Sequence, residues 1–249
     1  MVVRLKIYKY KDNLVEKKNY LYEGLGLDLS KKYIISFVGG GGKTSSIYNL
    51  AEELSNCNKK VIVTTTTHMQ MLKGKIILND NICEIKSMLS KNDYITVGIK
   101  TKDDKITSVS EDKVRELSNI CDFLLIEADG AKMLPLKAPA SHEPVILEIS
   151  NMVVGVCGID ALNKSIGDTC HRPQIVSELL NKDLESLIEV KDISYILSSK
   201  SGQMKDVKTN MEYRVIINKV DDNLKLEQAV LIAKELEDKN IEAIMTSYR

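Results

Sequence analysis

The chain has 249 residues, of which 43% are hydrophobic and 28% charged, a composition typical of a soluble globular protein. Lysine plus arginine and aspartate plus glutamate both number 35, and this balance argues against nucleic acid or an anionic membrane as the main partner. Without an apolar stretch of about 18 residues, the sequence predicts a protein of the cytoplasm.

The five cysteines are scattered, odd in number and without Cys-x-x-Cys spacing. We therefore expect neither a disulfide framework nor a zinc site. Cys121 and Cys157 lie beside or within apolar runs, and we expect both to be buried structural residues.

The first 32 residues are weakly patterned. Residues 5–10 alternate as a strand does, and residues 13–25 suit a helix. We expect this region to pack on the edge of the main sheet.

A glycine loop follows the next strand. The apolar run 33–38 predicts a buried strand, and a helical pattern places apolar residues 47, 50, 51 and 54 on one face. Between them stand Gly39, Gly40, Gly41, Gly42, Lys43, Thr44 and Ser45. Free backbone N–H groups and the start of a helix together suit a phosphate. Lys43 would lie near the outer phosphates, and the Thr44 hydroxyl would help to bind Mg²⁺.

The spacing of this loop is not the standard one. The usual pattern has a glycine five positions before the Gly-Lys pair, where this chain has Phe37. The shorter loop resembles that of Mur-type ligases. The alternative is a plain turn, but four glycines are costly to order, so we favour nucleotide phosphate binding.

A second buried strand, 61–63, runs into four threonines and His68. Ligands gather at the carboxyl ends of parallel strands, so a hydroxyl such as that of Thr66 would contact phosphate or Mg²⁺. A capped strand end is the alternative of equal weight. His68 is either a catalytic base or a surface residue.

Further along, the sequence predicts a hairpin around 102–104, formed by residues 94–99 and 105–109, and then a helix over 111–119 capped by Ser110.

The strand 123–126 ends in Glu127-Ala-Asp129-Gly130. One carboxylate at such a strand end would hold Mg²⁺, and the other would polarise an attacking water. The alternative is an ordinary Asp-Gly turn.

The window 131–144 holds three of the four prolines and predicts an ordered loop. Its candidates for substrate or phosphate contacts are Lys132, Lys137, His142 and Glu143, with a solvated loop as the alternative.

Another buried strand covers 152–157. Arg172 then stands just before a helix over 174–180 and suits a phosphate or carboxylate.

The strand 213–217 ends in Asn218-Lys219-Val220-Asp221, the Asn-Lys-x-Asp pattern with which GTPases read the base. There the carboxylate accepts from the guanine ring N–H and amine, which favours guanine over adenine. A strand-to-helix turn is the equal alternative. A helix over 224–238 and a strand over 241–245 close the chain.

Strands alternating with helices predict an α/β fold with a mostly parallel sheet, helices on both faces and a P-loop NTPase-like architecture. We expect residues 1–249 to form one domain, with a small helical insertion or subdomain over about 160–210.

Several motifs together resemble the YqeC family. They are the glycine loop 37–45, Val-Thr-Thr-Thr-Thr-His at 63–68, Glu-Ala-Asp-Gly-Ala-Lys at 127–132, 135–139, 142–144, 171–173 and 218–221. The resemblance runs from about residue 20 to the last strand, and 127–144 is its most specific part. It implies an accessory protein in the maturation of selenium-dependent molybdenum hydroxylases, whose reaction the resemblance does not define.

The predicted catalytic residues are Lys43, Glu127, Asp129 and His142. The predicted nucleotide contacts are Gly39, Gly40, Gly41, Gly42, Lys43, Thr44, Ser45, Thr66, Arg172, Asn218, Lys219 and Asp221. The predicted Mg²⁺ ligands are Thr44, Glu127 and Asp129.

We expect GTP or ATP, with a preference for GTP, to be bound and hydrolysed. A molybdenum cofactor or selenium intermediate, or a molybdenum hydroxylase, would be the further partner. The rival hypotheses are a Mur-like ligase or small-molecule kinase, and a non-enzymatic, nucleotide-gated delivery protein.

Overall fold

The computed structural model describes residues 5–12, 14–70, 75–91, 94–101 and 105–248. Its main strands are β1 (Lys6–Lys11), β2 (Leu14–Lys18), β3 (Tyr33–Gly39), β4 (Val61–Thr65), β6 (Ile76–Ile77), β7 (Tyr94–Val97), β10 (Phe123–Glu127), β12 (Met152–Gly158), β14 (Glu212–Asn218) and β15 (Glu242–Ser247). Short strands are β5 (His68–Gln70), β8 (Ile99–Lys100), β9 (Lys105–Thr107), β11 (Leu136–Lys137) and β13 (Cys170–His171). The helices are α1 (Leu21–Gly24), α2 (Lys43–Asn56), α3 (Ile82–Lys91), α4 (Glu111–Ile120), η1 (Ile159–Ala161), α5 (Ile166–Thr169), α6 (Pro173–Leu180), α7 (Val190–Ser198) and α8 (Asn223–Glu237).

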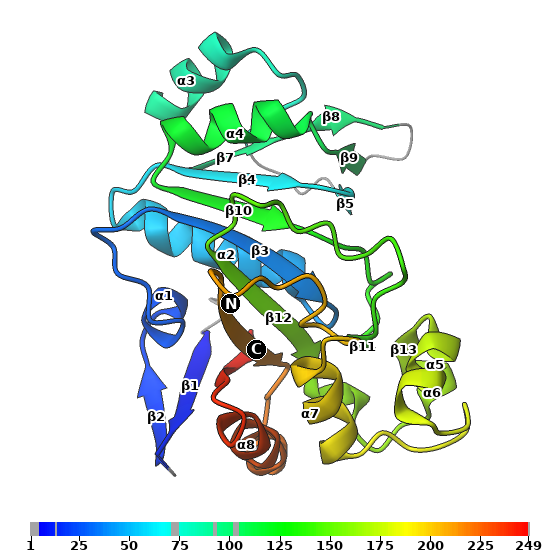
Figure 1. Ribbon diagram of the computed structural model, residues 1–249. Coiled ribbons are helices and arrows are strands. Elements are labelled where there is room, and N and C mark those ends of the chain that lie inside the picture. The colour runs from blue at the N-terminus through cyan, green and yellow to red at the C-terminus, as the bar shows by residue number, and fades with distance from the viewer. Residues whose placement is uncertain (1–4, 13, 71–74, 92–93, 102–104, 249) are drawn as a thin grey trace.

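The main strands form one ten-stranded sheet in the order β2-β1-β15-β14-β12-β3-β10-β4-β7-β6. Neighbours from β15 to β6 are parallel, whereas β1 pairs antiparallel with both β15 and β2. Figure 1 shows this sheet crossing the molecule with helices on its faces. The predicted α/β fold with a mostly parallel, helix-flanked sheet is therefore confirmed.

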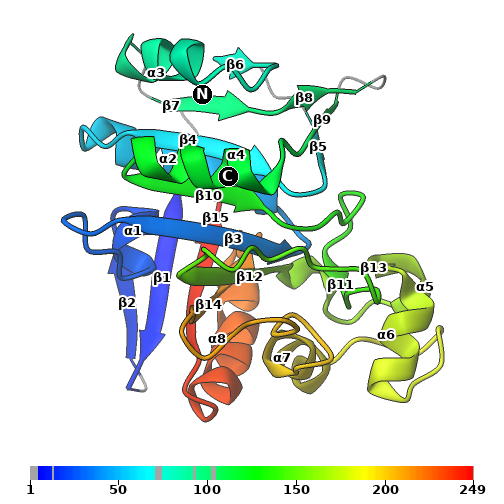
Figure 2. The same cartoon turned by 45° about the horizontal axis from the view of Figure 1, so that its top comes forward.

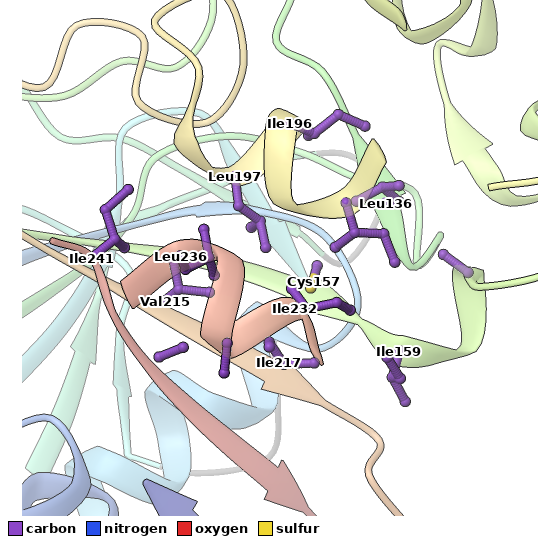
Figure 3. Close-up of a cluster of buried hydrophobic side chains, with 14 of the residues drawn as sticks. Leu136, Cys157, Ile159, Ile196, Leu197, Val215, Ile217, Ile232, Leu236 and Ile241 are labelled. Atoms are coloured by element: carbon purple, nitrogen blue, oxygen red, sulfur yellow. The ribbon is translucent and has the colours of Figure 1, made fainter. Parts of the chain in front are cut away.

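The central strands are buried because helices cover both faces of the sheet. On β3, Ile35 and Phe37 pack with Ile47 and Leu50 of α2, while Val38 belongs to the cluster on the other face. Figure 3 shows that second cluster, where Leu197 of α7 and residues of α8 meet the strands. Alternating side chains of one strand thus serve two separate cores.

The segment between β12 and β14 adds η1, α5, α6 and α7. In both overall views α5 and α6 lie beside the small sheet of β11 and β13, at one end of the large sheet (Figures 1 and 2). Since β11 pairs with β13, residues 136–137 are joined to 170–171 across more than thirty positions of chain.

One local prediction was wrong, and a second was confirmed only in part. Residues 14–18 of the predicted helix 13–25 form an edge strand, because β1 turns back on itself with Lys11 opposite Leu14, and only α1 is helical. The predicted hairpin exists between β8 and β9, but β7 instead joins the main sheet parallel to β4. Its tip at 102–104 and residue 13 lie outside the described residues.

Other predictions were confirmed. Ser110 caps α4 by accepting a hydrogen bond from the backbone of Lys113. Cys121 and Cys157 are buried, and burial raises the pKa of each thiol to about 12. None of the helices in the described ranges is long and apolar enough to cross a membrane.

Candidate functional site

The glycine loop lies at the carboxyl end of β3. The strands that follow β3 in the chain are added first on one side of it, up to β10, and then on the other side, from β12 onward. β10 flanks β3 on one side and β12 on the other, and all three are parallel. In open α/β sheets, ligands bind outside the carboxyl ends of the strands at such a switch point. The predicted loop therefore stands at the position where this type of sheet binds its ligands.

Close packing explains the glycines. Gly41 and Gly42 have φ angles of 72° and 123°, which residues with a Cβ rarely adopt. A Cβ at Gly41 would lie 2.1 Å from the backbone nitrogen of Gly158, and one at Gly42 would lie 2.2 Å from Asn218 Nδ2. The fold thus requires small residues here whatever the loop binds, so the case for an anion rests on other groups.

Three of the loop's N–H groups bond inside the protein. Gly39 donates to both Asp129 carboxylate oxygens at 3.1 Å, while Gly40 and Gly41 donate to backbone carbonyls at 2.9 Å. The start of α2 is different, because the N–H groups of its first three residues, 43–45, have no acceptor within the helix and Gly42 has no side chain to cap them. Donors for an anion are therefore concentrated at the start of α2.

Lys43, the first residue of α2, is 4% exposed. Its Nζ donates to the Gly39 carbonyl at 2.5 Å and lies 3.2 Å from Asp129 Oδ1. The ammonium group is therefore held beside the loop backbone by a carbonyl and a carboxylate.

Thr44 and Glu127 meet at the carboxyl end of the neighbouring strands β3 and β10. The Thr44 hydroxyl donates to Glu127 Oε2 at 2.7 Å. Burial raises the pKa of Glu127, although the Lys43 charge and the Thr44 hydrogen bond act in the opposite direction. Two oxygen ligands that include a poorly solvated carboxylate suit Mg²⁺, which takes few protein ligands and keeps waters and phosphates for the rest. In the described ranges no cluster of three acidic, histidine or cysteine side chains forms a metal site by itself.

A row of alternating charges extends from Lys43. We call Lys43, Asp129, Lys137, Glu143 and Arg172 the charge row. Lys137 Nζ lies 3.0 Å from Asp129 Oδ2 and 2.6 Å from Glu143 Oε2, and Arg172 Nη1 pairs with the same Glu143 oxygen. Buried charges are tolerated when they are paired in this way.

The pKa of the Glu143 carboxyl is set mainly by its charged neighbours. Burial by itself would raise the pKa of its carboxyl, but hydrogen bonds from Arg172 and Lys137 outweigh burial and lower the pKa to about 2. The predicted candidates Lys137, Glu143 and Arg172 thus contact one another. Arg172 is also the N-cap residue immediately before α6 and has a left-handed backbone, φ 56°.

The loop 130–144 is fastened by residues that the sequence did not single out. Leu134 accepts from Gly41, and Lys205 Nζ donates to the carbonyls of Ala140, Ser141 and Glu143 at 2.6–2.8 Å. Lysines after helices are common, so the sequence around Lys205 gives no sign that its side chain holds the loop. The expectation of an ordered loop is confirmed.

The predicted base-reading turn touches the glycine loop. Asn218 Nδ2 donates to the Gly41 carbonyl at 2.8 Å. Lys219 has a left-handed backbone and pairs with Asp160 at 2.8 Å. The first residue of the Asn-Lys-x-Asp turn therefore connects it directly to the predicted phosphate site.

The side chains of the other predicted residues bond elsewhere or are exposed, although the Thr66 backbone N–H donates to the Glu127 carbonyl at 3.1 Å. The Thr66 hydroxyl donates to the Val145 carbonyl, Ser45 is exposed on α2, and His68 is exposed at the start of β5. His142 is exposed on its loop, and within the described residues no hydrogen bond or ion pair joins it to the charge row. Lys132 is also exposed, with φ 46°.

Two open hollows lie elsewhere. One of about 410 Å³ is polar and lies after α6, and one of about 330 Å³ lies between α6 and α7. Their linings include none of the predicted site residues. The chemistry of the buried charges, rather than the size of a hollow, therefore marks the glycine loop as the candidate site.

Comparison with known proteins identifies relatives. A family model described as YqeC protein matches residues 35–174, a range that includes the glycine loop and the charge row. The Uncharacterized protein YqeC of Escherichia coli (strain K12) is 30% identical over 181 residues, covering 70% of this chain and 71% of that protein.

Proposed function

This chain belongs to the YqeC family, and we propose that it binds a nucleoside triphosphate with Mg²⁺ at the glycine loop and acts on the terminal phosphate. The observation that carries the proposal is the 2.7 Å hydrogen bond between Thr44, at the start of α2, and buried Glu127, at the end of β10. It brings together, immediately beside Lys43, two side-chain oxygens suited to binding Mg²⁺, whose other ligands would be waters and phosphate oxygens.

Phosphate oxygens would accept from the N–H groups at the start of α2, where the helix dipole adds to the attraction. Lys43 would exchange the Gly39 carbonyl for a phosphate oxygen. Mg²⁺, when bound, would neutralise phosphate charge and align the terminal group. Thr44 and Glu127 are the residues that would hold it.

Asp129 suits another role. Its carboxylate already faces two ammonium groups and the Gly39 N–H, so we assign it to orienting the nucleophile rather than to holding the metal. His142 keeps its predicted catalytic role as a proposal. Its exposed loop would present it to a second substrate.

Phosphoryl transfer, as in a kinase or Mur-like ligase, is the second candidate. The observation that favours it is the charge row, which leads from Lys43 to Arg172, a guanidinium whose side chain is 28% exposed. That cation would attract an anionic acceptor. The family resemblance links the protein, without defining its acceptor, to the maturation of selenium-dependent molybdenum hydroxylases. A P-loop NTPase-like architecture is part of the proposal for both candidate functions.

Titration calorimetry with GTP and ATP, with Mg²⁺ or with EDTA, tests the binding. We expect Lys43→Ala to remove detectable binding, and Glu127→Gln to lower affinity in Mg²⁺ to the level seen in EDTA, a loss of about tenfold or more. Lys208→Met, which alters an exposed ion pair on the surface, should bind as the parent does.

Lys43 is buried, so its variant requires a check of folding. Thr44→Ala, at a half-buried position, is the second test should Lys43→Ala unfold. Folded Lys43→Ala or Thr44→Ala protein that binds both nucleotides as tightly as the parent would contradict the proposal. With γ-labelled nucleotide, free phosphate alone indicates hydrolysis, and a phosphorylated organic product indicates transfer.

A further inference from the structure

The end of β15 holds the predicted base-reading turn from one side. Thr246 Oγ1 donates to Asn218 Oδ1 at 3.0 Å, and Ser247 Oγ donates to Asp221 Oδ1 at 2.8 Å. The sequence pattern predicts only a closing strand here. The structure thus adds two consecutive hydroxyls, each bonded to one of the two polar ends of the Asn-Lys-x-Asp turn.

These contacts are buried and specific. Asn218 is 3% exposed, Thr246 0% and Ser247 1%. Asn218 uses its oxygen for Thr246 and its amide nitrogen for the Gly41 carbonyl. Both functional atoms of one amide are therefore bonded, which fixes its orientation and keeps the turn in a constant position relative to the glycine loop.

A second contact ties the same strand end to α2. Tyr248 OH donates to Ser46 Oγ at 3.1 Å, and burial raises the pKa of the phenol to about 12, so it stays neutral and able to donate. Ser46 lies in the first turn of the helix that begins at the glycine loop. The ends of β14 and β15 and the start of α2 therefore form one connected unit.

We propose that the ends of β14 and β15 form a guanine-binding site, in which Asp221 reads the base and Ser247 is the residue that positions its carboxylate. This inference rests on the proposed function and names its substrate class, the guanine nucleotides. An ionised carboxylate accepts at about four lone-pair positions. Ser247 Oγ bonds to Asp221 Oδ1, and Lys225 Nζ lies 3.7 Å from Asp221 Oδ2, so guanine would approach a carboxylate that already has these two neighbours.

The chemistry of the two purines makes the site selective. Guanine presents a ring N–H and an amino group side by side, and one carboxylate accepts from both. Adenine presents a ring nitrogen lone pair at the equivalent position, which repels a carboxylate and leaves a polar group unpaired. Sites built to hydrogen-bond one such group reject analogues that lack it strongly.

A purely structural network at the strand end is the rival explanation, and the two differ in what a ligand senses. A structural network supports the folded state and affects every ligand equally. A positioning residue acts on guanine alone. Comparing GTP with ATP and with inorganic tripolyphosphate, which has phosphates but no base, separates the two.

Calorimetry with GTP, ATP, XTP and tripolyphosphate, each with Mg²⁺, tests the inference on the full chain. We expect the parent to prefer GTP over ATP by about 100-fold or more. Asp221→Asn should reverse the preference toward XTP, because its amide donates to the xanthine carbonyl. Ser247→Ala should weaken GTP about 3- to 10-fold, the effect of one positioning hydrogen bond, and leave tripolyphosphate unchanged.

Two further variants complete the design. Ser247→Thr keeps the hydroxyl and should restore much of the GTP affinity. Ser90→Ala removes an exposed hydroxyl on α3, which donates to the Ser87 carbonyl of the same helix, and should match the parent with every probe.

Each outcome is informative. Equal affinity for GTP and ATP overturns the guanine site while leaving the proposed function standing. A Ser247→Ala protein that loses affinity for all probes equally overturns the positioning role. A folded parent that binds no nucleotide and no tripolyphosphate overturns both the proposed function and this inference.

Discussion

The two ends of the candidate site are built from different interactions. The glycine-loop end contains the charge row, in which Lys137 is fully buried between two carboxylates. The β15 end relies on hydroxyl donors, with Thr246 bonded to an amide and Ser247 to a carboxylate. One end is therefore organised by ion pairs, and the other mainly by single hydrogen bonds.

The difference indicates a division of labour. Fixed charges attract a polyanion whatever its base, so the charged end suits affinity for phosphates. Hydrogen bonds distinguish donors from acceptors, so the β15 end suits selectivity between bases. The charged end lies within residues 35–174, the range matched by the family model, whereas Asn218 and Ser247 lie beyond it. The match to the family model therefore covers the charged end and leaves out the β15 end.

The largest effect should follow from breaking the charge row. Lys137→Met leaves Asp129 and Glu143 with fewer cations in a buried setting, so we expect it to lower the free energy of unfolding by about 3–5 kcal/mol. Thr246→Val, which removes one hydroxyl and leaves Asn218 Oδ1 short of a donor, should cost about 1–3 kcal/mol. Urea unfolding measures both. A greater loss of unfolding free energy in Thr246→Val than in Lys137→Met would show that the hydrogen-bonded end stabilises the fold more than the charged end.

Acid should weaken the charged end and leave the hydrogen bond between Thr246 and Asn218 unaffected. Glu143 has a pKa of about 2 in the folded protein against an ordinary value of 4.5, so it stabilises the fold above pH 4.5 and loses this contribution as the pH falls toward 2. The difference in unfolding free energy between the parent and Glu143→Gln should shrink over that range. For Thr246→Val the difference should stay constant, because neither Thr246 nor Asn218 titrates. Parallel curves for Glu143→Gln would contradict the prediction.

The smallest effect should come from an exposed ion pair made by the Asn-Lys-x-Asp turn. Lys219 and Asp160 form an ion pair whose side chains are 37% and 30% exposed. Pairs exposed to this degree contribute about 0.2–1 kcal/mol, so Lys219→Ala should change the free energy of unfolding by no more than that. Added salt should reduce the difference further. A loss comparable with that of Lys137→Met would place Lys219 in the charged end.

Local sequence patterns were sufficient to predict much of the fold. Apolar runs with strand length predicted β3, β10, β12 and β14, and helical spacing predicted α2, because burial imposes a period on the side chains whatever their partners are. The ends of those strands placed the glycine loop, the carboxylates and the Asn-Lys-x-Asp turn at one edge of the sheet. The weak pattern of residues 13–25 failed, because hairpin pairing with β1 outweighed helix propensity in residues 14–18.

Only the tertiary structure decided which of these groups meet. Thr44 and Glu127 are 83 positions apart, Glu143 and Arg172 are 29 apart, and Asp221 and Ser247 are 26 apart. Their contacts depend on strand order and on the path of the loop 130–144. Those are set by long-range packing of whole elements, and a local sequence pattern carries no record of a partner so far along the chain.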